Sequence, residues 1–263
     1  MKTQNLTIRT LAIVFLAITL SSCEKEIFGI RGTGPIVTEE LFLDDFSGIE
    51  LEGSFDVIIE YGTEQMVTVE GHQNVIDRLQ TRVSDGVWKI KLRPAQYYNV
   101  DMTVIITSPY IDKISLTGSG NIETTGFEDI QDLEVLLMGS GRIWSRDPFK
   151  VSGKSLVIIT GSGDIDLLLE TNRLSSEILG SGNIYLSGTT NDMSLEIQGS
   201  GHYEAYAMIS ENCKVSILSS GNAYVHANQT LDATITGSGN IFYKGSPNVD
   251  VSILGSGNIK NSN

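Results

Sequence analysis

Hydrophobic and polar residues alternate in short stretches along residues 110–260, and each stretch runs into the same five-residue phrase. The phrase reads Gly-Ser-Gly-Asn-Ile at Gly118–Ile122, and seven variants begin at Gly139, Gly161, Gly180, Gly199, Ser219, Gly237 and Gly255. Successive copies start 18 to 22 residues apart. A repeat of this length is typical of a solenoid, in which each copy forms one coil that stacks on the next.

Counting from the first residue of each phrase shows which positions are hydrophobic. Two residues upstream stand Leu116, Leu137, Ile159, Ile178, Ile197, Ile217, Ile235 and Ile253. Most residues four upstream and four downstream are also hydrophobic, whereas the positions between them are mostly polar. Alternation with a period of two predicts strands that have one buried face.

The same alternation places the two glycines of each phrase on the buried side, where a residue without a side chain permits a sharp corner. Each copy then supplies a strand, a corner, a second strand and a short polar return. We predict an all-β, single-domain parallel β-helix with about eight regular rungs, and a right-handed one because parallel crossovers are overwhelmingly right-handed. A β-sandwich of short strands is the alternative, but identical residues at identical offsets favour the solenoid.

The residue between the second glycine and the isoleucine forms a column of its own. It is asparagine in five copies: Asn121, Asn183, Asn222, Asn240 and Asn258. Stacked asparagines can bond to one another as an amide ladder, so we interpret this column as structural. A polar recognition stripe is the alternative.

The chain before the regular repeats is also rich in predicted strands, and Gly53–Val57 is a diverged copy of the phrase. We expect irregular N-terminal rungs and a cap, with a short helix at 74–79 capped by Asn74 and a tight turn at Asp85-Gly86. Residues 24–43 show no periodicity. The predicted divisions are a signal peptide (1–22), a lipidated Cys23 with a flexible tether (23–43) and the β-helical domain (44–263).

The N-terminus has the features of an export signal. Lys2 and Arg9 precede an apolar core of ten residues, Leu11–Leu20, which is too short to span a bilayer. The following Leu20-Ser21-Ser22-Cys23 resembles a lipobox, which implies cleavage before Cys23 and its acylation. More than one acyl chain gives stable membrane anchoring. An ordinary secretory signal with an incidental cysteine is the alternative.

The net charge limits the classes of partner that the protein can bind. The whole sequence has 18 basic and 32 acidic residues; removing residues 1–22 deletes Lys2 and Arg9, which leaves 16 basic residues and a net charge of −16. So acidic a protein is a poor ligand for nucleic acid or anionic lipid. We therefore expect the lipid on Cys23 to be its membrane contact, and no nucleic-acid partner.

The repeated phrase, the hydrophobic residues upstream of it and the lipobox together resemble one family. It is the GIN-domain family (DUF2807) of auto-transporter adhesin heads, which is common in Bacteroidetes, and Phe46–Ile49 resembles the start of that domain. The resemblance covers residues 44–260 and implies a β-helical domain on an exported protein. It implies no catalytic residues. We expect an envelope protein attached to the outer membrane, with display on the cell surface and orientation toward the periplasm both open.

Catalytic and metal-binding residues are hard to place in this pattern. The histidines His72, His202 and His226 do not converge on a common offset, so we predict no metal site and no cofactor. Parallel β-helices can carry acid clusters in an outer groove. Here Asp164 and Asp166, with Glu177, Glu196 and Glu204 on nearby rungs, would form such a patch in a polysaccharide-active enzyme. Cys213 falls in the inward column, as a buried small residue would.

The most suggestive surface feature is the residue five after the start of each phrase. Outward-facing aromatic residues recur there: Trp144, Tyr185, Tyr224 and Phe242. Exposed aromatic rows can bind sugars or a protein partner; burial by neighbouring segments is the alternative. We therefore predict a non-enzymatic adhesion or interaction module, with an enzyme or a structural envelope component as alternatives.

The last phrase lies close to Asn263 without a recognisable cap. An uncapped rung exposes backbone groups that invite strand pairing, so we expect self-association through it. A partly apolar outer column, Met138, Leu179, Leu218 and Leu254, adds to the surface that partners could contact.

Overall fold

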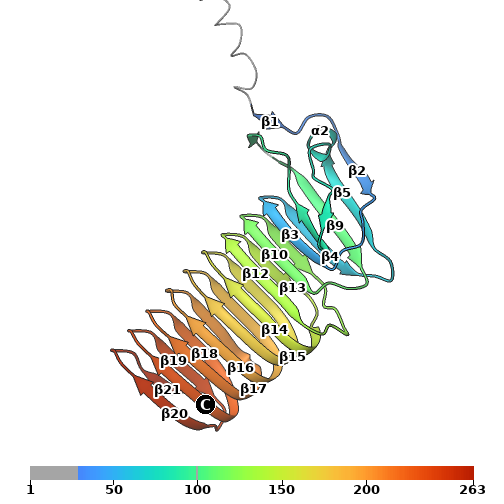
Figure 1. The fold of residues 1–263 in the computed structure, drawn as a ribbon. Helices are drawn as coiled ribbons and strands as arrows, with labels where there is room; N and C mark the ends of the chain where they lie inside the picture. Colours follow the sequence, from blue (N-terminus) through green and yellow to red (C-terminus); the bar gives the residue numbers. More distant parts are fainter. Residues whose placement is uncertain (1–28, 99) are drawn as a thin grey trace, which may run out of the picture.

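A computed structural model describes residues 29–98 and 100–263 as an all-β protein, 65% strand, in which stacked parallel coils form a β-solenoid of about seven turns (Figure 1). The solenoid and its parallel strands confirm the fold predicted from the sequence. The predicted signal peptide and Cys23 lie outside the described residues. Within those residues, no helix has the length and apolarity needed to cross a membrane.

Each coil has two faces that meet at the glycine corner. We call the strands before the corner the upstream face and those after it the downstream face. The first regular coils have separate strands for the two faces: β10 (Lys113–Gly118) and β11 (Asn121–Thr124), then β12 (Leu133–Gly139) and β13 (Arg142–Ser145). Parallel pairing keeps equivalent residues in register, as in Ile114↔Val135 and Ile122↔Ile143.

Later coils are more continuous, because one long strand follows the downstream face and bends into the upstream face of the next coil. These strands are β15 (Asp164–Ile178), β16 (Asn183–Ile197), β17 (His202–Ile217) and β18 (Asn222–Ile235). Before them, β14 (Phe149–Ile159) follows β13 after a short break and continues into the upstream face. The stack ends in β19 (Asn240–Lys244), β20 (Asn248–Ile253) and β21 (Ile259–Asn261).

The core consists of the hydrophobic columns that the alternation predicted. Leu116, Leu137, Ile159 and Ile178 have no exposed surface. The columns stay buried until the final coil, where Val251 is 48% and Ile253 40% exposed because no further described coil covers them.

The corner glycines are required by the close approach of successive coils. A Cβ atom on Gly141 would lie 2.0 Å from the carbonyl oxygen of Gly120 in the preceding coil, and one on Gly163 would lie 2.1 Å from that of Gly141. No side-chain atom fits at that distance, so glycine is needed for the backbones of successive coils to contact each other at the corner.

The N-terminal unit contains the first coils in an order that differs from the chain. Strands β3 (Gly48–Gly53) and β4 (Asp56–Tyr61) pair in parallel with β10 and β11. On their other side they pair in parallel with β7 (Val87–Ile90) and β9 (Met102–Ser108), which come later in the sequence. The coil formed first in the chain is thus the second coil of the stack.

Antiparallel strands close this end of the solenoid (Figure 1). Beside β9 lies β5 (Met66–His72), followed by β2 (Ile36–Leu41) at the edge. On the other face, β6 (Val83–Ser84) pairs with β7 across the predicted Asp85-Gly86 turn, where both residues have positive φ. A separate two-stranded sheet joins β1 (Ile30–Arg31) to β8 (Tyr97–Tyr98).

Two expectations for this unit were wrong. Regular structure begins before the predicted boundary at 44, because β2 lies inside the segment predicted as a tether. The helix α2 is shorter than predicted, Gln73–Ile76, and its N-cap residue is His72 without a side-chain capping bond. Asn74 instead holds the N-terminal arm: its Oδ1 accepts from the backbone N–H of Thr33 at 3.0 Å, and its Nδ2 donates to the carbonyl of Arg31 at 2.7 Å.

Candidate functional site

The aromatic residues predicted to share a row do so in the structure. Strand register on the downstream face aligns Trp144 with Asp166, then Tyr185, Glu204, Tyr224, Phe242 and Lys260 in consecutive coils. We call this line, from Trp144 to Phe242, the aromatic row. Because the strands are parallel and in register at these positions, the row presents aromatic and acidic groups at each coil spacing, about 4.8 Å.

The aromatic rings make specific contacts. Tyr224 stacks on Phe242 with ring centroids 4.9 Å apart, and Tyr206 meets Tyr224 edge-on at 5.5 Å. The ammonium of Lys244 lies 4.5 Å from the centre of the Tyr206 ring, which is a cation–π geometry. The row is therefore partly covered by its own neighbours, and Tyr185 is its most open member at 40% exposure.

The acids between the rings shape the electrostatics of the row. Tyr185 lies beside Asp166 and Glu204 in the neighbouring coils. Partial burial, followed by the charges of Asp164, Asp166 and Glu204, raises the pKa of the Tyr185 hydroxyl. Burial also raises the pKa of Glu204.

The structure separates the acids that were expected to form one patch. Glu177 and Glu196 pair on the upstream face, whereas Asp164, Asp166 and Glu204 belong to the downstream face. The carboxylate of Asp166 is bound to Arg142 at 2.8 Å, and Asp164 accepts from the Asn183 amide at 2.9 Å. The single five-acid patch was therefore a wrong prediction.

The three histidines also lie in separate parts of the structure. His202 belongs to the asparagine column, where its Nδ1 lies 3.4 Å from the Asn222 amide nitrogen, while His226 pairs with Lys244 and His72 lies in the N-terminal unit. Across residues 29–98 and 100–263, no three His, Cys, Asp or Glu residues are grouped as metal ligands would be.

The asparagine column forms the expected ladder. The amide nitrogen of Asn240 donates to Oδ1 of Asn222 at 3.0 Å, and the backbone N–H of Asn240 donates to the same oxygen, also at 3.0 Å. Asn258 repeats both contacts one coil later, on Asn240. These bonds are satisfied within the stack, so the column serves the fold.

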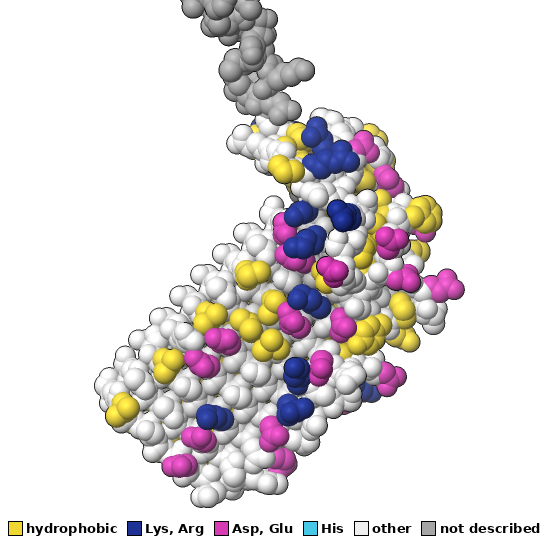
Figure 2. All heavy atoms as spheres, in the orientation of Figure 1, with side chains coloured by type: hydrophobic (Ala, Val, Ile, Leu, Met, Phe, Trp, Pro, Cys, Tyr) yellow, Lys and Arg dark blue, Asp and Glu magenta, His cyan; other side chains and the backbone are white. Residues whose placement is uncertain are grey.

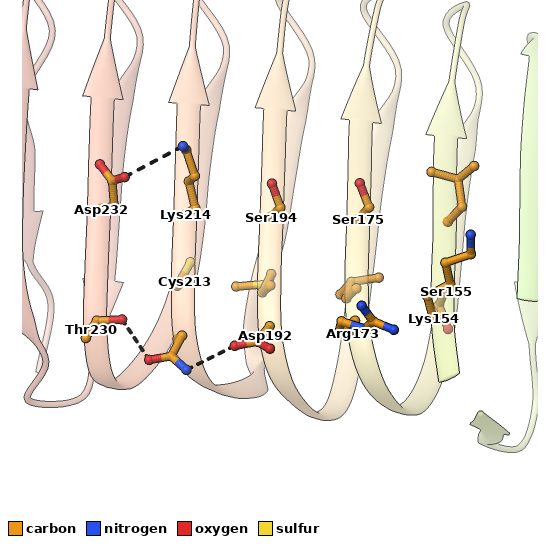
Figure 3. A pocket seen from close by; sticks show the side chains of 14 residues that line it. Lys154, Ser155, Arg173, Ser175, Asp192, Ser194, Cys213, Lys214, Thr230 and Asp232 are labelled. Carbon is orange, nitrogen blue, oxygen red and sulfur yellow. Dashed lines mark hydrogen bonds and ion pairs between the residues drawn. The ribbon is translucent and has the colours of Figure 1, made fainter. Parts of the chain in front are cut away.

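A groove on the upstream face was missed by the sequence analysis. It has a volume of about 540 Å³ and crosses five neighbouring strands. Figure 3 shows its two walls: one row contains Ser175, Ser194, Lys214 and Asp232, and the other contains Lys154, Arg173, Asp192 and Thr230. We call it the axial groove, because it runs along the stack and across the strands.

The axial groove had a signal in the sequence. Its walls stand five and seven residues before each phrase, where polar and charged residues recur, and Lys154 and Arg173 occupy the same offset in adjacent copies. These offsets lie outside the inward columns and the aromatic position on which the sequence-based prediction rested. Extending the count by one residue would have aligned the two cations.

The remaining outer column is interrupted by polar residues, as its sequence indicates. Met138, Leu179 and Leu218 are exposed, but each is separated from the next by a polar residue of the intervening coil. Figure 2 shows most hydrophobic side chains of the visible face as separate spots. Such spacing does not create a broad apolar patch.

Cys213 is buried, as predicted, and is a free thiol. Burial raises its pKa to about 12. A thiol in this state is protonated at neutral pH and is a poor nucleophile.

Comparison with known proteins supports the fold and the family. Residues 45–247 match the family model described as "Putative auto-transporter adhesin, head GIN domain". The solved structure of a "Putative lipid binding protein" from Parabacteroides distasonis is 30% identical, with a TM-score of 0.82, and covers 89% of this chain and 99% of its own. No curated protein matches the sequence.

Two more solved structures share the fold at lower identity. A putative adhesin from Parabacteroides merdae is 22% identical with a TM-score of 0.81, and one from Parabacteroides distasonis is 24% identical with a TM-score of 0.79. Each covers 89% of this chain and 99% of its own. With the family model matched over most of the solenoid, the chain belongs to the GIN-domain family of adhesin head domains.

Proposed function

We propose that this protein is a lipid-anchored binding module of the bacterial cell envelope that acts without enzymatic activity. Its partner, a glycan or a protein, contacts the aromatic row. The observation that carries the proposal is the alignment of Trp144, Tyr185, Tyr224 and Phe242 with acids on one straight face. Membership of an adhesin-like family supports the same role.

The chemistry of the row suits binding. Aromatic rings provide a large contact area at low entropic cost, and the Tyr185 hydroxyl and the acids offer hydrogen bonds at fixed spacing. The acids considered for glycan cleavage are engaged in structural contacts, with Asp166 bound to Arg142 and Asp164 to Asn183. This engagement favours binding over catalysis.

The proposed attachment is the acylated Cys23. In the sequence Cys23 precedes β1, and the described chain then passes through the N-terminal unit into the solenoid (Figure 1). A rod held at one end can present a side face to a partner. We propose the outer membrane as the site, and limited proteolysis of intact cells tests whether the rod faces outward: cleavage indicates surface display, and protection excludes adhesion to other cells.

Binding can be tested on a glycan array and on immobilised envelope proteins with three forms of the full-length protein. We expect wild type to bind and the Trp144→Ala, Tyr185→Ala double variant to lose at least about tenfold in affinity, as loss of central aromatic contacts does. Phe42→Ala is the matched control, since Phe42 is 88% exposed and lies in the N-terminal unit.

Asp164→Asn separates binding from catalysis. The substitution should leave binding intact, whereas a glycan-cleaving enzyme that used Asp164 would lose product formation. Turnover of any glycan by wild type would contradict the non-enzymatic role. A purely structural component would bind nothing on either surface.

A further inference from the structure

Three arginines from separate segments of the N-terminal unit meet around the short strand β8. Arg31 of β1 is the register partner of Tyr98, and its guanidinium lies 5.6 Å from the centre of the Tyr98 ring. Arg78 and Arg93 are joined through their backbones, because the N–H of Arg93 donates to the carbonyl of Arg78 at 2.8 Å. The Tyr97 hydroxyl in turn donates to the carbonyl of Arg93 at 2.6 Å. We call Arg31, Arg78 and Arg93 the arginine cluster.

The electrostatic surroundings of this strand are positive. Burial raises the pKa of the Tyr97 hydroxyl, and the charges of Arg78 and Arg93 oppose that rise. On the solenoid the opposite holds, since burial and then mainly the charges of nearby acids raise the pKa of Tyr110 and of Tyr185. The sign of the local charge around β8 is therefore reversed relative to the tyrosines of the solenoid.

Acids on neighbouring elements have other partners. Asp77 and Glu39 both accept hydrogen bonds from the Gln73 amide, at 3.0 Å and 2.7 Å, and Glu52 binds Lys91 at 3.0 Å. Within residues 29–98 and 100–263, no arginine of the cluster forms an ion pair. Other cations of the solenoid also lack an ion pair, so the distinguishing feature is the convergence of three arginines on one short strand.

The cluster lies where the chain leads back to the predicted lipid site. Figure 2 shows basic side chains gathered at the end of the N-terminal unit where the described chain begins. Arg31 follows Cys23 by eight residues. A fully extended chain covers at most about 3.6 Å per residue, so Arg31 lies within about 29 Å of Cys23. A lipid on Cys23 would thus keep the cluster close to the membrane surface.

The chemistry of the cluster suits phosphate. The planar guanidinium group donates two parallel hydrogen bonds to a phosphate group, and it keeps its charge at any physiological pH. Basic residues that lie at an anionic membrane surface are attracted to it individually. The net charge of the chain is an average, and the acids of the distant coils are screened beyond about 8 Å at physiological salt. The acidic composition therefore does not prevent this end from contacting anionic headgroups.

We propose that the arginine cluster binds the phosphate-bearing headgroups of the membrane into which the lipid on Cys23 inserts, so that the N-terminal unit rests on the membrane. This inference rests on the attachment proposed for Cys23 and is independent of the aromatic row. The lipid retains the protein at the membrane, and the arginines determine which of its surfaces faces the headgroups. The solenoid then projects from a fixed base.

The test is sedimentation with lipid vesicles of the chain Glu24–Asn263, which keeps every strand of the structure and lacks the predicted signal sequence and acylation site. One set of vesicles is phosphatidylcholine alone, and the other contains equal parts of phosphatidylcholine and phosphatidylglycerol. We expect at least about tenfold stronger partitioning onto the vesicles with phosphatidylglycerol. The difference should shrink as salt is added, because salt screens the attraction.

Two triple variants locate the contact. Arg31→Gln with Arg78→Gln and Arg93→Gln should lower partitioning about tenfold, to the level on phosphatidylcholine. Lys154→Gln with Arg173→Gln and Lys260→Gln is the matched control, since it removes the same charge from exposed side chains of the solenoid that also form no ion pair with a described residue. The control should partition like wild type, and circular dichroism should show a native fold for both variants.

Equal partitioning onto the two kinds of vesicle would overturn the proposal, as would an equal loss in both triple variants, which would reflect net charge alone. Displacement of the protein from the vesicles by inorganic phosphate at constant ionic strength would indicate a site for a small free anion, and would refute a membrane surface as the partner. Mass spectrometry of the protein isolated from cells tests the lipid on Cys23 separately. An unmodified Cys23 would refute the attachment, whereas the vesicle experiment refutes or supports the arginine contact itself.

Discussion

Single residues show how strictly the interior excludes charge. Cys213 and Tyr203 both point into the core, and Tyr203 has no exposed surface. Its hydroxyl lies 3.2 Å from the Ser176 hydroxyl and 3.5 Å from the Met193 sulfur. Burial raises the pKa of Tyr203 strongly and that of Cys213 to about 12. The core tolerates these polar groups in their neutral forms alone.

The free energy of unfolding should therefore fall in alkali. The unfolded chain releases the Cys213 proton near its ordinary pKa of 9.0, while the folded chain retains it to about 12. Folding thus binds a proton between these values, so the contribution of Cys213 to stability is constant below pH 9 and is lost progressively above it. Urea unfolding at pH 8 and pH 10 measures the decline, which should be smaller in Cys213→Ala.

Met193→Leu, in the same inward column, is the control for that experiment. It should keep the full alkaline decline because it removes no titrating group. An equal decline in Cys213→Ala and wild type would show that the thiol ionises freely in the folded protein.

The alternation of hydrophobic and polar positions was enough to predict that Cys213 points into the core and that the aromatic row points outward. It could not place Asn74, because the partners of its side chain are backbone groups of Arg31 and Thr33, some 40 residues earlier. Asparagine is a good N-cap residue for a helix, so the local sequence predicted that role for Asn74. The distant N-terminal arm instead offers its side chain two hydrogen bonds. Local chemistry identifies what Asn74 can do, and tertiary packing decides which partner it meets.

At the level of strands and corners, the glycines set the spacing of the stack. Gly141 contacts the backbone of Gly120, and its backbone conformation is one that alanine also adopts. Replacement by alanine consequently tests the contact between coils without adding φ strain at residue 141 itself. We expect Gly141→Ala to lower the free energy of unfolding by about 1–3 kcal/mol, as overpacking does.

Urea unfolding checks this value, with Ser140→Ala as the control. Ser140 is exposed at the same corner, so its replacement should change stability by less than about 0.5 kcal/mol. If both variants unfolded like wild type, the coils would have to separate more easily at this corner than the structure indicates.

The regular strands were predictable because each copy of the phrase repeats the same offsets, and in-register pairing preserves them. The first coils were not, since β7 and β9 return to pair with the outer side of β3 and β4. The axial groove was only partly predictable from the sequence. Its residues repeat with the phrase, but the concavity between its walls depends on how the strands bend.

For the whole molecule, the two ends of the stack differ. Antiparallel strands cover the N-terminal end, whereas the last described coil exposes Val251, Ile253 and Leu254. Exposed apolar edge strands pair readily with other chains. We expect two copies to associate through β20, so that the molar mass from light scattering after size-exclusion chromatography rises with protein concentration.

Val251→Lys with Ile253→Lys should abolish that rise, because inward-column lysines on an edge oppose pairing. Leu179→Lys with Leu218→Lys changes the same number of exposed apolar residues on the side of the rod, and should leave association intact. A strict monomer at high concentration would contradict the expectation.

The exchanged order of the first coils also affects the order in which the chain folds. The β3–β4 coil has neighbours on both sides only after the chain has reached Ser108 at the end of β9 and continued into β10 and β11. Every later coil needs only the coil before it. Folding should consequently wait for one slow, nonlocal assembly and then spread by repeated local additions. Gain or loss of a whole repeat would alter the length of the rod and leave its starting template unchanged.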